Sequence, residues 1–200
     1  EMTCVEQAGQ LENPDARIVV DVLVDSALLS EYADGVHGFG SKDSPRYFRQ
    51  FWEMFAPNED WQIMSTTVGR TIDFGGKEQL VYWQNGKGLL AELGRKGLAI
   101  PAGGLAWRKK GVQISQMSEL PATLYFGEIF DKNTAVVLPH NPSHLPAIWC
   151  FCSSPDYNTA VRKIDQKLSV TNATLVKIPF DLSHWQKVAA EKYPHGLPEP

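Results

Sequence analysis

Two stretches in the middle of the chain decide its fold class. They are GRTIDFGGKEQLVYWQNGKG at residues 69–88 and LAWRKKGVQISQMSELPATLYFGEIFD at residues 105–131. Both contain short runs of β-branched and aromatic residues, and glycines break these runs. Turns are expected at Gly75–Gly76 and Asn85–Gly86. The pattern predicts strands over residues 62–68, 78–83, 107–118, 123–130 and 135–138.

Helical signals surround these strands and become dense after them. Apolar residues recur at helical spacing after the last predicted strand, where Val161, Ile164 and Leu168 form one stripe. Predicted helices cover residues 26–34, 145–151 and 156–168, with one amphipathic turn after Asp181 that gives way to prolines. Ser44–Pro45 is predicted to cap a further helix, along which Phe48, Phe51, Trp52 and Phe55 fall at helical spacing. These aromatic residues are expected to form core, and the alternative is that they stack on bases. A strand at 17–25, a glycine-rich loop at 35–44, a short apolar segment at 98–100 and a loop running into a strand at 170–180 complete the prediction. The fold class is therefore α+β, a mixed and mainly antiparallel sheet with helices concentrated toward the C-terminal part.

The composition is that of a globular protein. The 200 residues are 43% hydrophobic and 21% charged, and this length suits one domain, or one domain with an appended subdomain. There is no run of about 18 apolar residues, so no transmembrane helix is expected. An odd number of cysteines argues against a disulfide framework and favours a reducing cytoplasm. The chain begins at Glu1 and ends in LPEP, and we expect it to be part of a larger protein.

Basic residues gather in the middle of an acidic chain. The formal net charge is −4, yet residues 93–118 contain no acidic residue. Lys and Arg neutralise phosphates, Arg also binds guanine edges, Gln pairs with adenine, and Ser contacts several bases. The cluster Trp107–Lys110 and the following Gln113 and Ser115 therefore favour a DNA contact. The alternative is a solvated edge strand whose lysines prevent edge-to-edge pairing.

Six segments of the chain follow one another in a recognisable order. A glycine-containing loop leads into an aromatic and basic segment, and paired glycines, a basic strand, an apolar strand ending in Phe–Asp, a serine-containing turn and a Thr–Asn loop follow. They read GFGSKDSPRYFRQFWEM (38–54), DFGGKEQLVYWQNG (73–86), WRKKGVQIS (107–115), YFGEIFD (125–131), LPAIWCFCSSPDYN (145–158) and VTNATLVKIPF (170–180). In this order they resemble the target-recognition domain of type IIG restriction–modification enzymes and related N6-adenine DNA methyltransferases.

The resemblance implies a part that reads a DNA sequence and does no chemistry of its own. It divides the chain into a flexible arm (1–16), a target-recognition domain (17–182) and a C-terminal tail (183–200). The partners would be double-stranded DNA and the methyltransferase catalytic domain of the parent chain, in a restriction–modification or phage-defence system. Contacts are expected from the loops around 66–78 and 104–118. The expected DNA-binding residues are Arg46, Arg49, Arg70, Lys77, Trp107, Arg108, Lys109, Lys110, Gln113 and Ser115.

The catalytic signatures of that family do not occur in this sequence. There is no glycine-rich S-adenosylmethionine loop and no Asn-Pro-Pro-aromatic motif, the nearest match being Asn141–Pro142–Ser143–His144. We therefore expect no cofactor and no catalytic residue in this chain, and S-adenosylmethionine in the parent protein. The rival hypothesis is a non-catalytic protein–protein docking module of a larger assembly, which exposed aromatic residues and acidic ends would suit.

Other chemistries find little support in the residues. His140, His144, Cys150 and Cys152 form an H-x3-H-x5-C-x-C pattern, and both residue types are zinc ligands. Prolines interrupt the helix that would align the histidines, and the cysteines stand in an apolar run. No metal site is expected. No Gly-x-Ser-x-Gly motif and no convincing nuclease carboxylate cluster are present either.

Overall fold

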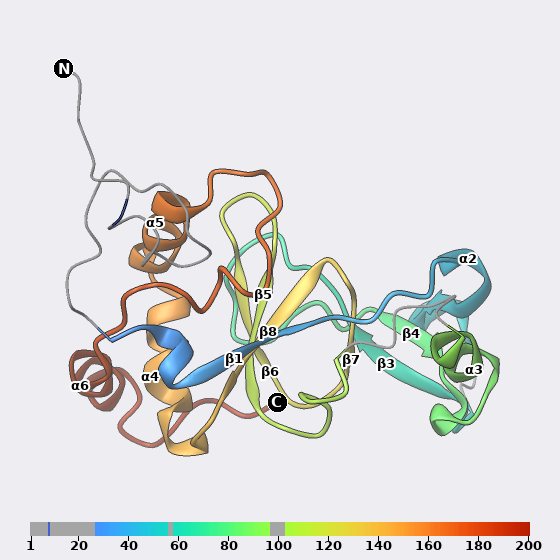
Figure 1. Ribbon diagram of the computed structural model, residues 1–200. Coiled ribbons are helices and arrows are strands. Elements are labelled where there is room, and N and C mark those ends of the chain that lie inside the picture. The colour runs from blue at the N-terminus through green and yellow to red at the C-terminus, as the bar shows by residue number, and fades with distance from the viewer. Residues whose placement is uncertain (1–7, 9–26, 56–57, 97–102) are drawn as a thin grey trace.

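The computed structural model describes residue 8 and residues 27–55, 58–96 and 103–200. The predicted strand at 17–25 and the apolar segment at 98–100 lie outside the described residues. The described part is elongated, with a larger lobe at one end and a smaller lobe at the other (Figure 1). Each lobe is built on one four-stranded sheet.

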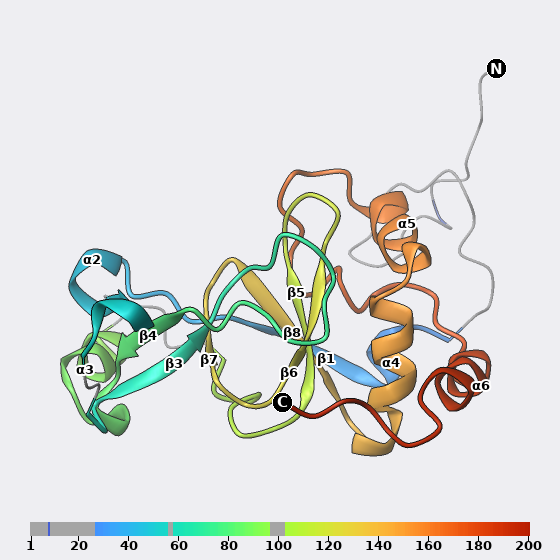
Figure 2. The same cartoon turned by 180° about the vertical axis from the view of Figure 1, so that it is seen from behind.

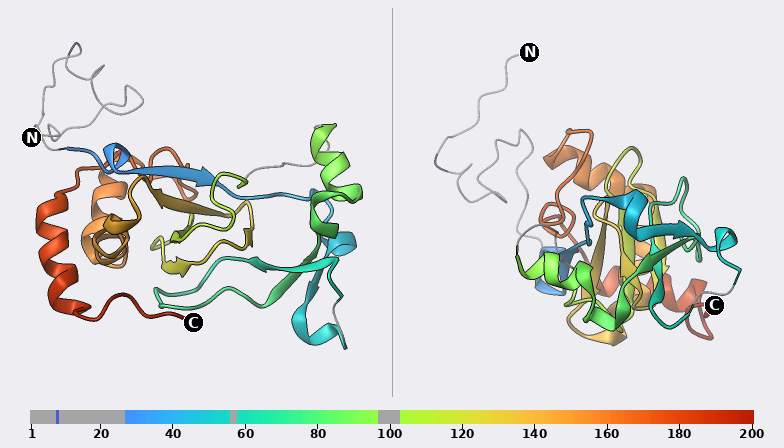
Figure 3. Two further views of the ribbon diagram at one scale, coloured as in Figure 1. Left: turned by 90° about the horizontal axis from the view of Figure 1, so that it is seen from below. Right: turned by 90° about the vertical axis from the view of Figure 1, so that its right-hand side faces the viewer.

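The larger lobe contains an antiparallel sheet in the order β1-β8-β5-β6. Its strands are β1 (Ala33–His37), β8 (Thr134–Pro139), β5 (Gly111–Ser115) and β6 (Ala122–Tyr125). Three helices follow β8: α4 (Leu145–Cys152), α5 (Pro155–Ile164) and α6 (Leu182–Lys192). Helix α4 packs against β5 and carries α6 and α5 on its other sides (Figure 3). The indole N–H of Trp149 donates to the Tyr193 hydroxyl at 2.9 Å, which fastens the end of α6 to α4.

The smaller lobe contains the sheet β2-β4-β3-β7, in which only the β3–β7 pair is parallel. The strands are β2 (Phe48–Gln50), β4 (Gln79–Tyr82), β3 (Trp61–Ser65) and β7 (Ile129–Phe130), accompanied by α2 (Ser44–Tyr47) and α3 (Leu89–Arg95). Short 3-10 turns lie at Leu29–Glu31, Phe51–Glu53, Gln84–Gly86 and Pro142–His144. At the crossing between the lobes a Cβ on Gly38 would lie 2.0 Å from the Asp131 carbonyl oxygen, so only glycine fits there.

The central strands are buried on both faces. Along β8, Ala135 and Val137 face the helices, whereas Val136 and Leu138 belong to a second cluster with Tyr125. This explains why β5, β6 and β8 are buried at every position, a pattern that a sheet with one solvated face does not show.

The α+β class, the mainly antiparallel sheets and the C-terminal helices are confirmed, but several element predictions are wrong. The helix predicted at 26–34 is a 3-10 turn followed by β1. The helix predicted to begin at Ser44–Pro45 does begin there, as α2, but it ends at Tyr47, and β2 and another 3-10 turn follow it. Strand β5 begins at Gly111 rather than at residue 107, and α6 is longer than the predicted single turn. Helix α3 was not predicted. No described helix is both long and apolar enough to cross a membrane.

Candidate nucleic-acid interface

The basic segment before β5 is a compact turn rather than the start of the strand. The Ala106 N–H donates to the Gly103 carbonyl, and the Arg108 N–H donates to the Gly127 carbonyl, each at 2.9 Å. Arg108 has a φ of 62°, in the left-handed region. Its backbone lies against Gly127, where a Cβ would come within 2.5 Å of the Arg108 Cα atom. The turn is thus fixed by its main chain, which leaves the basic side chains exposed.

Trp107 anchors this turn. Its ring is half-buried, and its centroid lies 5.1 Å from that of Trp83 in an edge-to-face arrangement. It packs against the clusters of both lobes. Trp107 therefore contributes to the junction between the lobes, and only part of its ring remains accessible to a partner.

The basic side chains of this region differ in what already neutralises them. Lys77 forms an ion pair with Glu128, and Lys110 pairs with Glu199 at 2.5 Å. Both ammonium groups also lie over the Phe126 ring, at 5.0 and 5.6 Å from its centroid. In the described part of the chain, no residue pairs with the side chains of Arg108 and Lys109. These two are the cations available to an anionic partner.

The loop at 66–78 runs beside the free edge of β6 (Figure 2). The Thr66 N–H donates to the Gly76 carbonyl at 2.7 Å and closes the neck of the loop. Further along, the Ile72 N–H donates to the Ala122 carbonyl and the Leu124 N–H to the Asp73 carbonyl, both at 3.1 Å. The loop therefore covers an edge that would otherwise be open to strand pairing.

Arg70 stands on this loop, exposed, beside a shallow hollow of about 490 Å³ that the loop itself lines. Like Arg108, it has no partner among the residues that the structure describes. Because the segment around Ile72 pairs with the start of β6 and Lys77 lies at Phe126, the loop carries basic side chains to both ends of β6.

Gln113 and Ser115 are not at the surface. Their exposed fractions are 1% and 5%. The Gln113 Oε1 atom accepts from the Ser65 hydroxyl at 2.6 Å, and its Nε2 atom donates to the Thr66 carbonyl at 2.7 Å. The Ser115 hydroxyl accepts from the Val68 N–H at 2.9 Å. The geometry does not support base contacts by these two side chains, because their polar groups are used in holding the start of the 66–78 loop.

Arg46 and Arg49 lie in the smaller lobe, on α2 and β2, at the end of the molecule away from β6 (Figure 1). The Arg46 guanidinium lies 5.4 Å from the centroid of the Tyr47 ring. The Arg49 Nη1 atom donates to the carbonyls of Pro45 and Phe48 at 2.7 and 2.6 Å. The structure thus brings Lys77, Arg108, Lys109 and Lys110 into one region and leaves these two arginines outside it.

The aromatic run after Arg49 is largely exposed, so the prediction that it forms core is wrong. Phe51, Trp52 and Phe55 are 55%, 63% and 107% exposed. The rings of Phe51 and Trp52 meet edge-to-face with centroids 5.0 Å apart. We call these three residues the aromatic patch. Helical spacing suggested a buried face, but β2 is an edge strand, and among the described residues none of these three side chains belongs to a core cluster.

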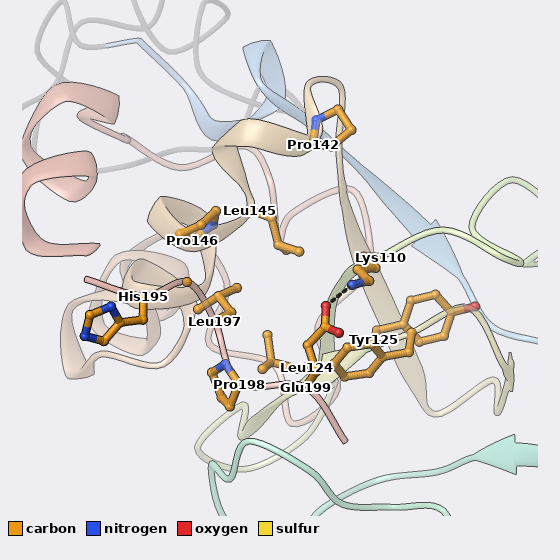
Figure 4. A pocket seen from close by; sticks show the side chains of 12 residues that line it. Lys110, Leu124, Tyr125, Pro142, Leu145, Pro146, His195, Leu197, Pro198 and Glu199 are labelled. Carbon is orange, nitrogen blue, oxygen red and sulfur yellow. Dashed lines mark hydrogen bonds and ion pairs between the residues drawn. The ribbon is translucent and has the colours of Figure 1, made fainter. Parts of the chain in front are cut away.

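The C-terminal segment forms one wall of a pocket beside β6 (Figure 4). The pocket is about 360 Å³ in volume, and mostly apolar side chains from β6, α4 and the C-terminal segment line it. At its rim the Glu199 carboxylate accepts from Lys110, and this hydrogen bond lowers the pKa of Glu199. The tail thereby neutralises one lysine of the basic turn.

The four candidate zinc ligands do not converge. His140 contacts Asp34 and the Glu31 carbonyl, each at 3.2 Å. Cys150 and Cys152 are buried in α4, and burial raises the pKa of both thiols. Within the described ranges no three His, Cys, Asp or Glu side chains are grouped as metal ligands are. Asn141 accepts from the Ser143 N–H at 3.0 Å, which is the role of a helix cap.

Comparison with known proteins adds no identification. No family model matches the chain, and no curated protein matches it.

Proposed function

We propose that this chain is the DNA target-recognition part of an S-adenosylmethionine-dependent N6-adenine DNA methyltransferase, acting in a cytoplasmic restriction–modification or phage-defence system. The ordered series of six sequence segments supports the family. The methyl transfer would take place in the catalytic domain of the parent protein, and the described residues would position DNA for it.

The observation that carries the proposal is the pairing of a fixed loop with unneutralised cations. Buried Gln113 and Ser115 hold the start of the 66–78 loop, while Arg70, Arg108 and Lys109 remain exposed. Phosphate contacts need cations in fixed positions, and base readout needs loops whose ends do not move.

Salt-dependent DNA binding tests this proposal. Each phosphate contact contributes about −0.9 to the slope of log K against log salt, so the sequence cluster Arg108–Lys110 would contribute about −2.7. Because Glu199 already neutralises Lys110, we expect about −1.8 from Arg108 and Lys109. The double variant Arg108→Ala, Lys109→Ala should flatten the slope by that amount.

The matched control removes two exposed lysines from the helical side, Lys163→Ala and Lys187→Ala, at the same change in net charge. It should leave the slope close to that of the unsubstituted chain. Equal slopes for both double variants would make the basic turn a solvated surface and refute the proposal as stated.

The aromatic patch favours a second candidate function, a protein–protein docking module. Interfaces are enriched in Trp and Phe, and exposed aromatic side chains of this size are uncommon on a surface with no partner. The affinity of docking through Phe51, Trp52 and Phe55 would depend little on salt concentration, whereas the affinity for phosphates falls steeply as salt concentration rises. Binding to the catalytic domain of the parent chain that is lost in Trp52→Ala and unchanged by salt would support docking.

A further inference from the structure

A pocket of about 370 Å³ lies at the junction of the two lobes, a volume within the range of small-ligand sites. Its walls come from the smaller sheet, from the basic turn and from the segment between β6 and β7. The lining residues are Gln62, Ile63, Trp83, Asn85, Trp107, Arg108, Gly127, Glu128 and Ile129. The indoles of Trp83 and Trp107 form its aromatic part.

Three polar groups of this pocket retain unused hydrogen-bonding capacity. The Gln62 Nε2 atom donates to the Asn85 Oδ1 atom at 3.0 Å. This leaves the Gln62 Oε1 atom as an acceptor and the Asn85 Nδ2 atom as a donor. The Arg108 guanidinium has no partner in the part of the chain described by the structure. Glu128 is already used, by Lys77 and by the Phe126 N–H.

The pocket is also rimmed by left-handed backbone. The φ angles are 51° at Asn85, 62° at Arg108 and 105° at Gly127. A left-handed conformation costs an L-residue such as Arg about 1–2 kcal/mol. Strained residues of this kind persist where the surrounding structure holds them, and they cluster at ligand sites.

We propose that this pocket binds an unpaired nucleobase of DNA. The base lies beside the two indoles, its edge pairs with the free amide groups of Gln62 and Asn85, and its phosphate binds Arg108. Amide side chains supply the donor and acceptor that a base edge requires, and unpaired bases are held by aromatic rings and Arg. The inference rests on the proposed DNA-binding function, and it adds an unpaired base to the ligand.

The test uses the 200-residue chain labelled with 5-fluorotryptophan and single-stranded oligodeoxyadenylate that carries 2-aminopurine. The fully paired duplex of the same sequence is the second probe. Asn85→Gly and Arg108→Gly remove the proposed contacts without strain, because glycine adopts the left-handed region freely. Gln84→Gly is the matched control, since Gln84 has a φ of 52° and does not line the pocket.

We expect 2-aminopurine fluorescence to fall on binding of the single strand and the fluorine signals of Trp83 and Trp107 to shift. Asn85→Gly and Arg108→Gly should each weaken single-strand binding about tenfold, the factor that a loss of 1.4 kcal/mol produces. Gln84→Gly should bind as the unsubstituted chain does.

Salt-dependent duplex binding with unshifted fluorine signals, and with Asn85→Gly binding the single strand as tightly as Gln84→Gly does, would overturn the pocket and leave the proposed function standing. Equal quenching by the paired and single-stranded probes would also overturn it, because the contact would then need no unpaired base. If neither probe binds at low salt, both the pocket and the proposed function are refuted.

Discussion

Replacing Gln113 by Leu separates the two roles that this side chain could have. The substitution keeps a side chain of similar volume and removes both amide groups. The Ser65 hydroxyl and the Thr66 carbonyl then lose partners at 2.6 and 2.7 Å. Each hydrogen bond is worth about 1 kcal/mol net, and an unpaired buried group costs about 1–3 kcal/mol. We expect the free energy of unfolding to fall by about 2–4 kcal/mol.

The same substitution should also weaken DNA binding without changing which bases are preferred. Gln113 holds the start of the 66–78 loop, so its loss loosens every contact of that loop together. The matched control is Gln116→Leu. Gln116 is 5% exposed and its Nε2 atom donates to the Val170 carbonyl at 2.8 Å. Its loss should cost stability in the larger lobe and leave DNA affinity unchanged under conditions where both variants are folded.

Equilibrium urea unfolding measures the first effect, and fluorescence anisotropy with a randomised duplex library measures the second. A double-mutant cycle with Ser65→Ala should give a coupling energy of about 1 kcal/mol, because the two side chains share one hydrogen bond. The reasoning is refuted if Gln113→Leu unfolds within about 0.5 kcal/mol of the unsubstituted chain and relaxes the preference at a single base position. Gln113 would then read a base, as the sequence pattern predicted.

Three further outcomes are expected. Glu199→Gln should strengthen DNA binding and steepen the slope of log K against log salt by about −0.9, because it frees Lys110. Since the pKa of Glu199 is lowered, the unsubstituted chain should gain the same affinity only as the pH falls through that pKa. Equal DNA affinities of the variant and the unsubstituted chain would count against a tail that neutralises Lys110. Gly38→Ala should lower the free energy of unfolding by about 1–3 kcal/mol or more, measured by urea unfolding, and a neutral result would contradict the close approach between the lobes. In a variant that lacks Cys4, Cys150 and Cys152 should react with a thiol reagent only after denaturant is added, since burial raises the pKa of both; rapid reaction of the folded chain would show that α4 opens.

Local sequence patterns predicted β3, β4, β5, β6 and β8 because each of these strands carries its own signal, but they missed β1 and β2. Along β5, apolar Val112 and Ile114 alternate with polar Gln113 and Ser115, so the sequence alone places the two pairs on opposite faces of the sheet. It did not reveal that the second face is buried. The residues that cover that face, Ser65 to Val68, are 47 or 48 positions away in the sequence. Alternation reports which side chains share a face, and only the tertiary structure determines what lies against that face.

The aromatic patch shows that a sequence pattern can also predict burial that the structure does not have. Phe51, Trp52 and Phe55 have the spacing and the apolar character of a buried helix face. In the structure Phe51 and Trp52 lie on an exposed 3-10 turn, and Phe55 lies exposed just after it. Helical spacing of apolar residues shows that they could form a packing surface. That surface is buried only where another layer of secondary structure packs against it. In this lobe the cluster around Met64, Val81 and Trp83 fills the interior without them.

Under the proposed function, stability and partner contact are carried by different residues. The groups that fix the 66–78 loop are neutral, buried and paired with one another, whereas Arg70 and Arg108 are exposed and stand on backbone that is held by main-chain hydrogen bonds. Surface substitutions away from buried networks change stability by only about ±0.5 kcal/mol. The exposed residues that would contact a partner can therefore be substituted while the buried groups that fix the 66–78 loop keep the domain folded. That separation is what sequence-specific recognition requires, because specificity changes through the contacting side chains and depends on a frame that keeps them in place.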